Sequence, residues 1–340
     1  MFDDILKEFA DEKTRPGAGI ITTEYVPFDG LDTGSINLNW AIGNGRGIPR
    51  GQVTLISGAE GSGKTSLLIL MGTKTVKDGG KVAVLNYEGR WNVEYAWRSG
   101  MGVPGKNYFL ISPYSQEDGL NIIVDLAKRG FDLCMVDSAT AMSPRAEVDG
   151  ELEDATMMLQ SRVFSKFFRM RMSDIALSSM ALVFIAQNRM SPNQYEPVTV
   201  TGGKALKYFS SVHVKMSGST ADDWEYATED DKKLKRNPVG LKITGKTGKN
   251  SVAPPMREIN VRVRFSPGLH VNKPAELVDY GKEHRVLTKE DGGPIAGAAH
   301  WYYNGVLLGR KREEALMAIG NDKDLQVELE RKILDVMKGS

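Results

Sequence analysis

The stretch Gly58-Ala59-Glu60-Gly61-Ser62-Gly63-Lys64-Thr65, followed by Ser66, decides the fold. It matches the phosphate-binding loop, a glycine-rich turn between a buried strand and a helix. The glycines let backbone N–H groups point at a di- or triphosphate, helped by the N-terminus of the helix. Lys64 is expected to neutralise the β- and γ-phosphates and Thr65 to ligate Mg²⁺. The stretch therefore predicts a nucleotide site.

Short apolar runs surround this loop, at 53–56, 82–85, 133–136 and 182–186. They are rich in Val, Ile and Leu without alternation, which is typical of strands buried on both faces of a mostly parallel sheet. Helical patterns at 64–77, 118–129 and 157–180 lie between them. This order predicts a doubly wound α/β core.

The pattern changes after residue 210. Runs at 212–216, 241–244 and 259–265 indicate antiparallel strands, and the charged stretch 222–236 between them is expected to be a solvated loop. Further on, Asn304-Gly305 between aromatic and aliphatic residues predicts a two-residue hairpin. Helical patterns at 311–320 and 323–337 follow, so the tail is predicted to be a small α+β module.

The chain is expected to have three parts. Residues 1–30 read as a short amphipathic helix and a linker, which docks either on its own domain or on a neighbouring copy. Residues 31–268 form the predicted ATPase core, and 269–340 the small C-terminal domain.

Composition narrows the class of protein. The 340 residues carry 44 Lys and Arg against 43 Asp and Glu, a net charge of +1, which excludes a broadly basic or broadly acidic protein. The one cysteine, Cys134, excludes an internal disulfide and a cysteine-based zinc site, and is expected to be a core residue. A signal pattern and a membrane-spanning run are both lacking, so we expect a cytoplasmic protein without membrane contact.

Polar residues follow three of the predicted strands. Asp137 is expected to complete the magnesium site, because the carboxyl ends of parallel strands face the ligand. Glu88 can deprotonate the water that attacks the γ-phosphate, unless it is an ordinary surface residue. Gln187 can sense the γ-phosphate and pass its presence to the long loop 188–203. A strand-capping Gln and an ordinary surface loop remain the alternative.

A basic stripe lies on the predicted helix 157–180. Arg162, Ser165 and Arg169 share one face, which suits a phosphate backbone, although such stripes are often merely solvated. The preceding stretch 147–154 is acidic and does not suggest nucleic acid. From these residues alone the chain is a Mg²⁺-dependent NTPase whose use of the energy stays open.

The motifs together resemble the bacterial RecA recombinase family. The resemblance runs in order from about residue 31 nearly to the end, and it rests on the stretches 31–35, 58–65, 86–88, 136–151, 184–190, 201–208, 252–255 and 276–279. It implies a RecA-type ATPase core that forms an ATP-dependent filament on single-stranded DNA, pairs it with homologous double-stranded DNA and exchanges strands. The implied partners are therefore both forms of DNA and further copies of the chain itself.

The resemblance also assigns residues around the nucleotide. Tyr95 matches a residue that packs on adenine, and Asn92 takes the place of an aspartate at the base edge. Gln187 matches the glutamine that couples the γ-phosphate to the second DNA loop. Lys249 matches a lysine that reaches the ATP of the neighbouring subunit. Where the family has a second such lysine, this chain has Ser251, for which Lys246 or Arg257 are possible substitutes.

Two loops are implied to line the DNA, here 150–158 and 188–203. Met157 falls where the family inserts a side chain between base triplets. The residues at positions that contact the DNA backbone are Arg162, Ser165, Arg169, Arg189, Gly202, Gly203 and Lys204. The second loop is about two residues short, the N-terminal helix is shorter than usual, and the family's acidic tail is missing. Arg310, Lys311 and Arg312 are a candidate duplex-binding patch or simply a solvated face.

Two other functions share the ATPase core. One is a ring-forming helicase motor, although nothing here resembles helicase-specific modules. The other is an accessory protein that binds DNA and uses ATP only to hold subunits together, an alternative that the serine at position 251 keeps open. The motifs as a whole favour the recombinase.

Overall fold

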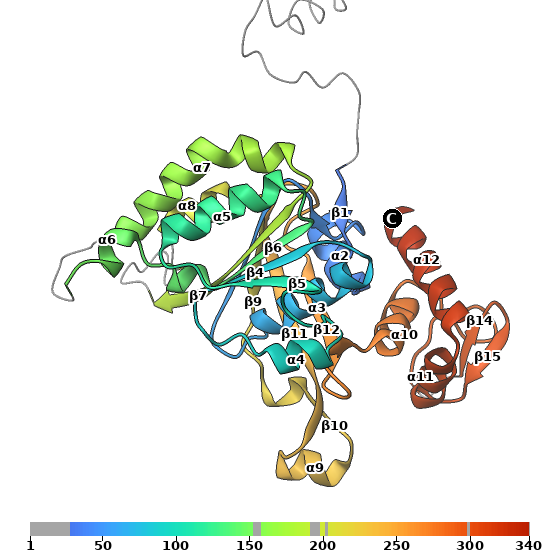
Figure 1. The fold of residues 1–340 in the computed structure, drawn as a ribbon. Helices are drawn as coiled ribbons and strands as arrows, with labels where there is room; N and C mark the ends of the chain where they lie inside the picture. The colour runs from blue at the N-terminus through green and yellow to red at the C-terminus, as the bar shows by residue number, and fades with distance from the viewer. Residues whose placement is uncertain (1–27, 152–157, 191–197, 201–202, 298–299, 340) are drawn as a thin grey trace, which may run out of the picture.

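The computed structural model describes residues 28–151, 158–190, 198–200, 203–297 and 300–339. The predicted N-terminal helix lies outside these residues. A long mixed sheet in the order β13-β12-β11-β9-β3-β7-β6-β4-β5 forms the centre of the molecule (Figure 1). Its strands are β3 (Val53–Gly58), β4 (Val82–Asn86), β5 (Tyr108–Ile111), β6 (Leu133–Asp137), β7 (Ala181–Met190), β9 (Val212–Met216), β11 (Pro238–Asn250), β12 (Glu258–Arg264) and β13 (His270–Val271).

The remaining elements cover or extend this sheet. The helices are α2 (Ile36–Gly43), α3 (Lys64–Lys77), α4 (Val93–Arg98), α5 (Gln116–Lys128), α6 (Arg145–Val148), α7 (Leu159–Leu177), α8 (Gly203–Phe209), α9 (Glu229–Leu234), α10 (Lys273–Glu283), α11 (Arg312–Asn321) and α12 (Lys323–Gly339). The small strands are β1 (Gly30–Leu31), β2 (Ile48–Pro49), β8 (Val198–Val200), β10 (Trp224–Tyr226), β14 (Trp301–Tyr303) and β15 (Val306–Gly309), and the 3₁₀ turns are η1 (Ala139–Ala141) and η2 (Ala221–Asp223). None of the helices within the described ranges is long and apolar enough to cross a membrane.

The core of the sheet is parallel, as predicted. β9, β3, β7, β6, β4 and β5 pair in parallel, whereas β11, β12 and β13 continue the sheet in antiparallel fashion. β3, β4 and β6 are buried on both faces because helices pack on each side, which explains why their sequences do not alternate, whereas β5 at the edge is partly exposed. The doubly wound α/β prediction is therefore confirmed.

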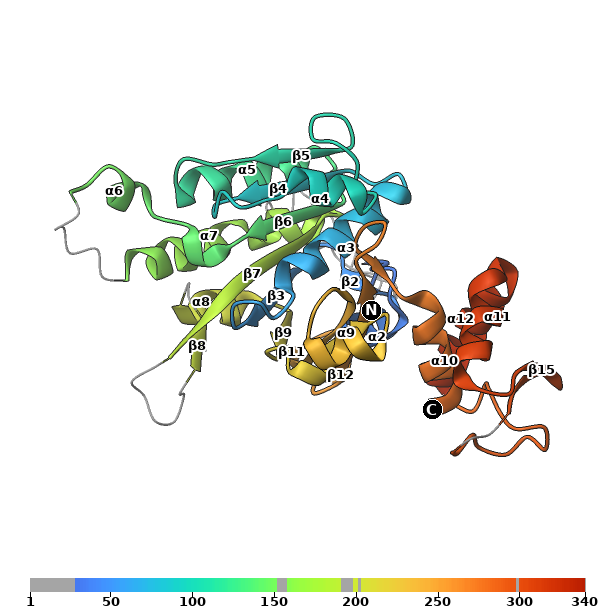
Figure 2. The ribbon, with the colours of Figure 1, turned by 90° about the horizontal axis from the view of Figure 1, so that it is seen from below.

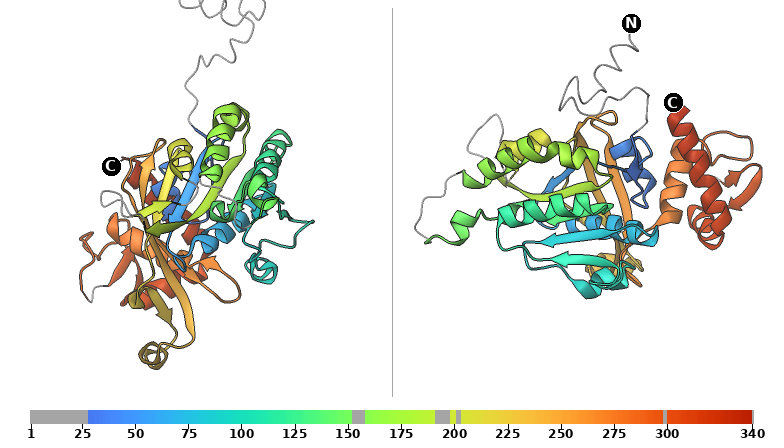
Figure 3. Two further views of the ribbon diagram at one scale, coloured as in Figure 1. Left: turned by 90° about the vertical axis from the view of Figure 1, so that its left-hand side faces the viewer. Right: turned by 45° about the horizontal axis from the view of Figure 1, so that its top comes forward.

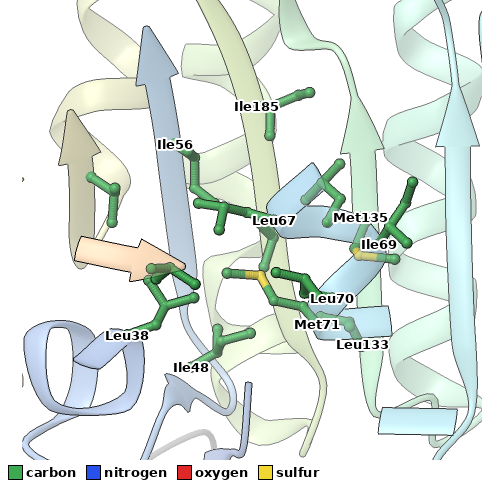
Figure 4. Close-up of a cluster of buried hydrophobic side chains, with 14 of the residues drawn as sticks. Leu38, Ile48, Ile56, Leu67, Ile69, Leu70, Met71, Leu133, Met135 and Ile185 are labelled. Carbon is green, nitrogen blue, oxygen red and sulfur yellow. The ribbon is translucent and has the colours of Figure 1, made fainter. Parts of the chain in front are cut away.

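Each face of the sheet has its own apolar cluster. On one side, Ile56, Met135 and Ile185 pack against Leu67 and Met71 of α3 (Figure 4). The neighbouring strand residues point the other way, toward α5 and α7, which lie together over the opposite face (Figure 3). This alternation holds α3, and with it the loop that precedes α3, rigidly against the middle of the sheet.

The predicted helices are present with small changes at their ends. α3 spans the predicted 64–77, since Gly79 in the left-handed region (φ 83°) turns the chain back toward β4. α5 begins at Gln116 because the Ser115 hydroxyl caps it, accepting the N–H of Asp118 at 3.2 Å. Cys134 is fully buried in β6, and burial raises the pKa of its thiol, as expected of a core residue.

Two predictions about the second half of the sheet are wrong. β9 is not an antiparallel strand on both sides, because it pairs in parallel with β3 and only its other edge meets β11 in antiparallel fashion. Gln187 does not end its strand either. β7 continues to Met190 and pairs with β8, so part of the expected loop 188–203 is a two-stranded extension (Figure 2).

The charged stretch 222–236 is also more than a solvated loop. β10 pairs with β11, and α9 follows at the tip of this excursion (Figure 1). The excursion is anchored because Glu225 accepts a hydrogen bond from Arg262 at 2.7 Å and Trp224 packs against the core. The charged residues on either side of Trp224–Tyr226 made this stretch look like a loop, whereas β10 pairs with β11 at the sheet.

The C-terminal elements gather around α10 and lie on the opposite side of the molecule from α6 (Figures 1 and 3). The predicted hairpin is confirmed, with Asn304 and Gly305 both in the left-handed region at φ 48° and 78°. A buried carboxylate joins this part to α2: Glu276 accepts hydrogen bonds from the Ser35 hydroxyl at 2.5 Å and from the Asn37 N–H at 3.1 Å.

We predict that His213 makes the stability depend on pH. His213 is 1% exposed in β9, beside the Ser57 hydroxyl at 2.8 Å, and burial together with the charge of Lys215 lowers its pKa to about 4. An unfolded chain takes up a proton near pH 6.5, whereas the folded protein does not until the pH approaches 4. Stability is therefore full above pH 6.5 and falls by on the order of 3 kcal/mol toward pH 4.

Urea unfolding between pH 7.5 and pH 4 measures this loss. His213→Asn should flatten the profile in that window whatever its effect on absolute stability, and the exposed His270→Asn serves as the matched control. A parental slope in His213→Asn would contradict the assignment.

Candidate active site

A pocket of about 390 Å³ opens at the carboxyl ends of the parallel strands. The pocket is lined by the loop before α3, the first turn of α3, the turn after β4, the end of β6 and the middle of β7. Single residues of β10 and β11 and the residue after β12 complete it. The lining residues are Glu60, Gly61, Ser62, Gly63, Lys64, Thr65, Ser66, Glu88, Arg90, Asp137, Ile185, Gln187, Trp224, Leu241 and Phe265. The sequence-predicted loop, base, magnesium carboxylate and γ-phosphate sensor are thus brought into one pocket.

The loop has the geometry that phosphate binding needs. Gly61 and Gly63 adopt φ 72° and 84°, which side chains disfavour, and a Cβ on Gly63 would lie 3.2 Å from Ile243. Lys64 opens α3 and is only 8% exposed. Its amine donates to the Ala59 carbonyl at 2.6 Å and to the Gly58 carbonyl at 3.1 Å, so it curls into the loop. Burial lowers the pKa of Lys64, and the negative charge of Glu88 counteracts part of this lowering.

Thr65 and Asp137 form the part of the pocket that suits Mg²⁺. The Thr65 hydroxyl donates to Asp137 Oδ2 at 3.2 Å, and Asp137 is 6% exposed. Burial, and then the charge of Glu88, raise the pKa of Asp137 to about 6. No cluster of three His, Cys, Asp or Glu able to hold a metal occurs within the described residues. One hydroxyl and one carboxylate fit Mg²⁺ that also takes phosphate oxygens and water.

Glu88 is held beside Asp137 by the backbone. The N–H groups of Tyr87 and Glu88 donate to the Asp137 carbonyl at 2.8 and 3.3 Å, which extends the pairing of β4 with β6. The Ser138 hydroxyl donates to Glu88 Oε1 at 2.5 Å and fixes the carboxylate. A positioned half-buried carboxylate at this point can accept a proton from a water molecule in the pocket.

Gln187 joins the pocket to the second predicted DNA loop. It lies opposite Gly58 in the parallel ladder, and its N–H donates to the Thr140 hydroxyl at 2.8 Å. The strand runs on from Gln187 to Arg189, which pairs with Thr199 of β8. One continuous strand therefore links the pocket wall to the hairpin.

Five predicted nucleotide or catalytic residues lie outside the pocket lining, namely Gly58, Ala59, Asn92, Tyr95 and Lys249. Asn92 caps α4, its side-chain oxygen accepting the Tyr95 N–H at 2.8 Å, and the Tyr95 ring packs partly against the core. Lys249 donates to the Tyr208 carbonyl at 2.6 Å, with its amine 5.8 Å from the Tyr208 ring centre. Lys249 therefore does not serve the nucleotide pocket of its own chain.

The proposed substitutes and the C-terminal patch are partly engaged elsewhere. The Arg257 guanidinium donates to the Trp40 carbonyl at 2.7 Å and stacks 4.0 Å from that ring's centre, whereas Lys246 is exposed. Arg312 donates to Asp279 at 2.6 Å. Arg257 is thus fixed against α2, and Arg312 is fixed against α10.

Only some of the residues predicted to contact DNA lie in the part of the chain that the structure describes. Arg162 and Arg169 are exposed on α7, and Ser165 donates to its own helix at the Ser161 carbonyl, 2.8 Å away. Arg189 lies in β7, and Gly203 and Lys204 open α8. Met157 and Gly202 lie outside the described residues.

Sequence reasoning missed part of the pocket lining. Trp224 and Phe265, with ring centres 6.3 Å apart, lie with Leu241 on an apolar wall. Arg90 joins the pocket from the turn after Glu88. The sequence held two indications of these residues. One is the short Trp-Glu-Tyr run inside the charged stretch 222–236, and the other is the arginine two residues after Glu88.

Comparison with known proteins identifies the family of this chain. The family model described as the RecA N-terminal domain matches residues 11–270. Protein RecA of Sulfurimonas denitrificans is 33% identical over 319 residues, covering 92% of this chain and 86% of the relative. Protein RecA of Helicobacter pylori strain Shi470 is 33% identical over 311 residues, covering 90% and 83%.

Protein RecA of a Wolbachia from Drosophila simulans is 33% identical over 315 residues, covering 91% of this chain and 82% of the relative. Among solved structures, the crystal structure of the RadB recombinase matches 70% of this chain and 98% of its own, with 19% identity and a TM-score of 0.49. The family model and the RecA relatives span most of the sequence, and by that measure this chain belongs to the RecA family of recombinases and ATPases.

Proposed function

We propose that this RecA-family ATPase uses ATP and Mg²⁺ to assemble on single-stranded DNA, pairs that strand with a homologous duplex and exchanges strands. The main support for this proposal is that β7 extends from the nucleotide pocket to its pairing with β8. Gln187 lines the pocket, and two residues later Arg189 pairs with Thr199 of β8, within the stretch 188–203 that the sequence predicts to bind DNA. A strand that spans both places can transmit the state of the γ-phosphate to a DNA-binding loop.

The phosphates would lie in the loop before α3. The backbone N–H groups of residues 61–65 and the Lys64 amine bind phosphate oxygens there. Thr65 and Asp137 would hold Mg²⁺, which when bound draws charge from the β- and γ-phosphates. Burial and the charge of Glu88 raise the pKa of Asp137 to about 6, so a nearby cation would stabilise its charged form.

Hydrolysis would use Glu88 as the base. The carboxylate, held by Ser138, takes a proton from water as the water oxygen bonds to the γ-phosphorus and the bond to the leaving ADP oxygen breaks. Binding alone suffices for pairing in this scheme, and hydrolysis releases the DNA. The adenine base would lie toward the aromatic side of the pocket, where Trp224 and Phe265 form the wall and Tyr95 packs on the same core cluster.

The neighbouring subunit would complete the site. Tyr208 is 75% exposed and carries Lys249 against its carbonyl, which gives an accessible basic surface on a face that does not line this chain's own pocket. We propose that this surface meets the nucleotide of an adjacent copy. DNA would run along Arg162 and Arg169 of α7, and duplex capture would fall to Arg310 and Lys311, since Arg312 is paired.

Electron microscopy with single-stranded DNA and a slowly hydrolysed ATP analogue tests the assembly. We expect helical filaments that form joints with homologous duplex. Closed rings would support a motor instead, and filaments without joints would support an accessory binder, the function that Ser251 keeps open.

We predict that Lys64→Ala abolishes both ATP hydrolysis and ATP-dependent retention of single-stranded DNA. The amine lies inside the phosphate loop, and its loss removes a charge that ATP binding needs. Lys77→Ala, an exposed change at the other end of α3, is the matched control and should behave like the parent. Equal DNA retention by the parent without nucleotide, with ADP and with ATP would contradict the proposal.

We predict a different defect in Glu88→Gln. The amide keeps the hydrogen-bonding shape but accepts no proton from water, so hydrolysis should fall by about 100-fold or more while filaments still form and pair DNA. Phosphate release and joint-molecule assays separate the two effects. Glu94→Gln on nearby α4 is the control, and a parental hydrolysis rate in Glu88→Gln would remove Glu88 from its role.

A further inference from the structure

Arg90 stands in the pocket because of the turn that follows β4. Gly89 adopts φ 67°, a left-handed conformation with nothing within 4 Å of where its Cβ would lie. The chain therefore bends at a glycine, and residues on both sides of it, Glu88 and Arg90, line the same pocket. In an extended strand, residues two apart would also share a face, but the strand has ended at Asn86 and the turn delivers this pair.

The Arg90 guanidinium has no partner within the part of the chain that the structure describes. It is exposed, and it makes neither a hydrogen bond nor an ion pair there, even though Glu60 and Glu88 line the same pocket. Other arginines nearby do pair: Arg98 bonds Glu94 at 2.6 Å. Because Arg90 forms no ion pair with either of these carboxylates, its guanidinium is available to bind a negatively charged ligand.

The charges of the lining residues favour a role for the Arg90 guanidinium at the bound phosphates. Within the described lining, the carboxylates of Glu60, Glu88 and Asp137 face only two cations, Lys64 and Arg90. Lys64 is already placed inside the loop by the Gly58 and Ala59 carbonyls. A nucleoside triphosphate adds about four negative charges, of which Mg²⁺ offsets two. A cation close to Glu88 would offset part of the remaining charge, in addition to the Lys249 that we propose an adjacent copy supplies.

We propose that Arg90 is a catalytic residue of its own chain's ATPase site, where its guanidinium contacts the γ-phosphoryl oxygens and stabilises their charge during hydrolysis. The planar fork of an arginine matches two phosphoryl oxygens at once. In the mechanism proposed above Glu88 acts at the attacking water, and Arg90, which lies two residues further along the same turn, would then reach the γ-phosphate. This inference rests on the proposed ATPase function and deepens it.

Steady-state phosphate release with saturating single-stranded DNA tests the role. Arg90→Ala should lower kcat about 100-fold with a smaller change in KM for ATP, because the contact strengthens as charge develops. Arg90→Lys keeps the charge without the fork and should recover only about a tenth of the parental rate. ADP affinity, read with a fluorescent ADP, should stay close to parental, since ADP lacks the γ-phosphate.

The controls separate this inference from other readings. Arg98→Ala, which removes a paired arginine outside the pocket lining, should hydrolyse ATP like the parent. Arg90→Ala should keep the parental melting temperature and still form filaments with a slowly hydrolysed analogue. A parental kcat in Arg90→Ala overturns the inference, and so does a loss of rate that only follows lost filament assembly. Absence of DNA-stimulated hydrolysis in the parent would instead overturn the proposed function, and the inference with it.

Discussion

The hydrogen-bonded register of the parallel strands is the constraint on which the site depends. The ladders set Gly58 opposite Gln187 and Asn86 opposite Asp137, so the ends of β3, β4 and β6 meet Gln187 of β7 at one edge of the parallel part of the sheet. Neighbouring strands lie about 4.8 Å apart, which brings side chains from three strands within reach of one phosphate chain. A slip of one residue would turn Asp137 to the other face of the sheet and separate it from Thr65.

Charge within the pocket explains how its residues divide the work that we propose. Burial and Glu88 raise the pKa of Asp137, while burial lowers the pKa of Lys64. Burial therefore disfavours the charged forms of both side chains. Bound Mg²⁺ would stabilise the carboxylate of Asp137, and bound phosphate would stabilise the ammonium group of Lys64. Arg90, exposed at the turn after Glu88, adds a cation without that burial cost.

The same sheet connects the pocket with distant surfaces. β7 carries Gln187 at the pocket and Arg189 in the hairpin with β8, and β11 carries Leu241 in the pocket wall and Lys249 on the surface near Tyr208. Two strands therefore lead from one nucleotide to the two surfaces that we assign to DNA and to a neighbouring copy. A strand that is hydrogen-bonded along its length can carry a displacement from one end to the other, which is the coupling that our proposal requires.

The sequence alone determined the loop at 58–66, the buried parallel strands, α3 and the Asn304-Gly305 hairpin, because each follows from local patterns of glycine, apolar residues and caps. It also singled out Glu88, Asp137 and Gln187, each after a run of apolar residues, as candidate site residues. Only the tertiary structure decided that β7 continues past Gln187, that Trp224 leaves a charged stretch to join the pocket, and that Arg257 is held by Trp40. These outcomes depend on pairing and packing with segments distant in the chain, and no local pattern records which distant partner a side chain will meet.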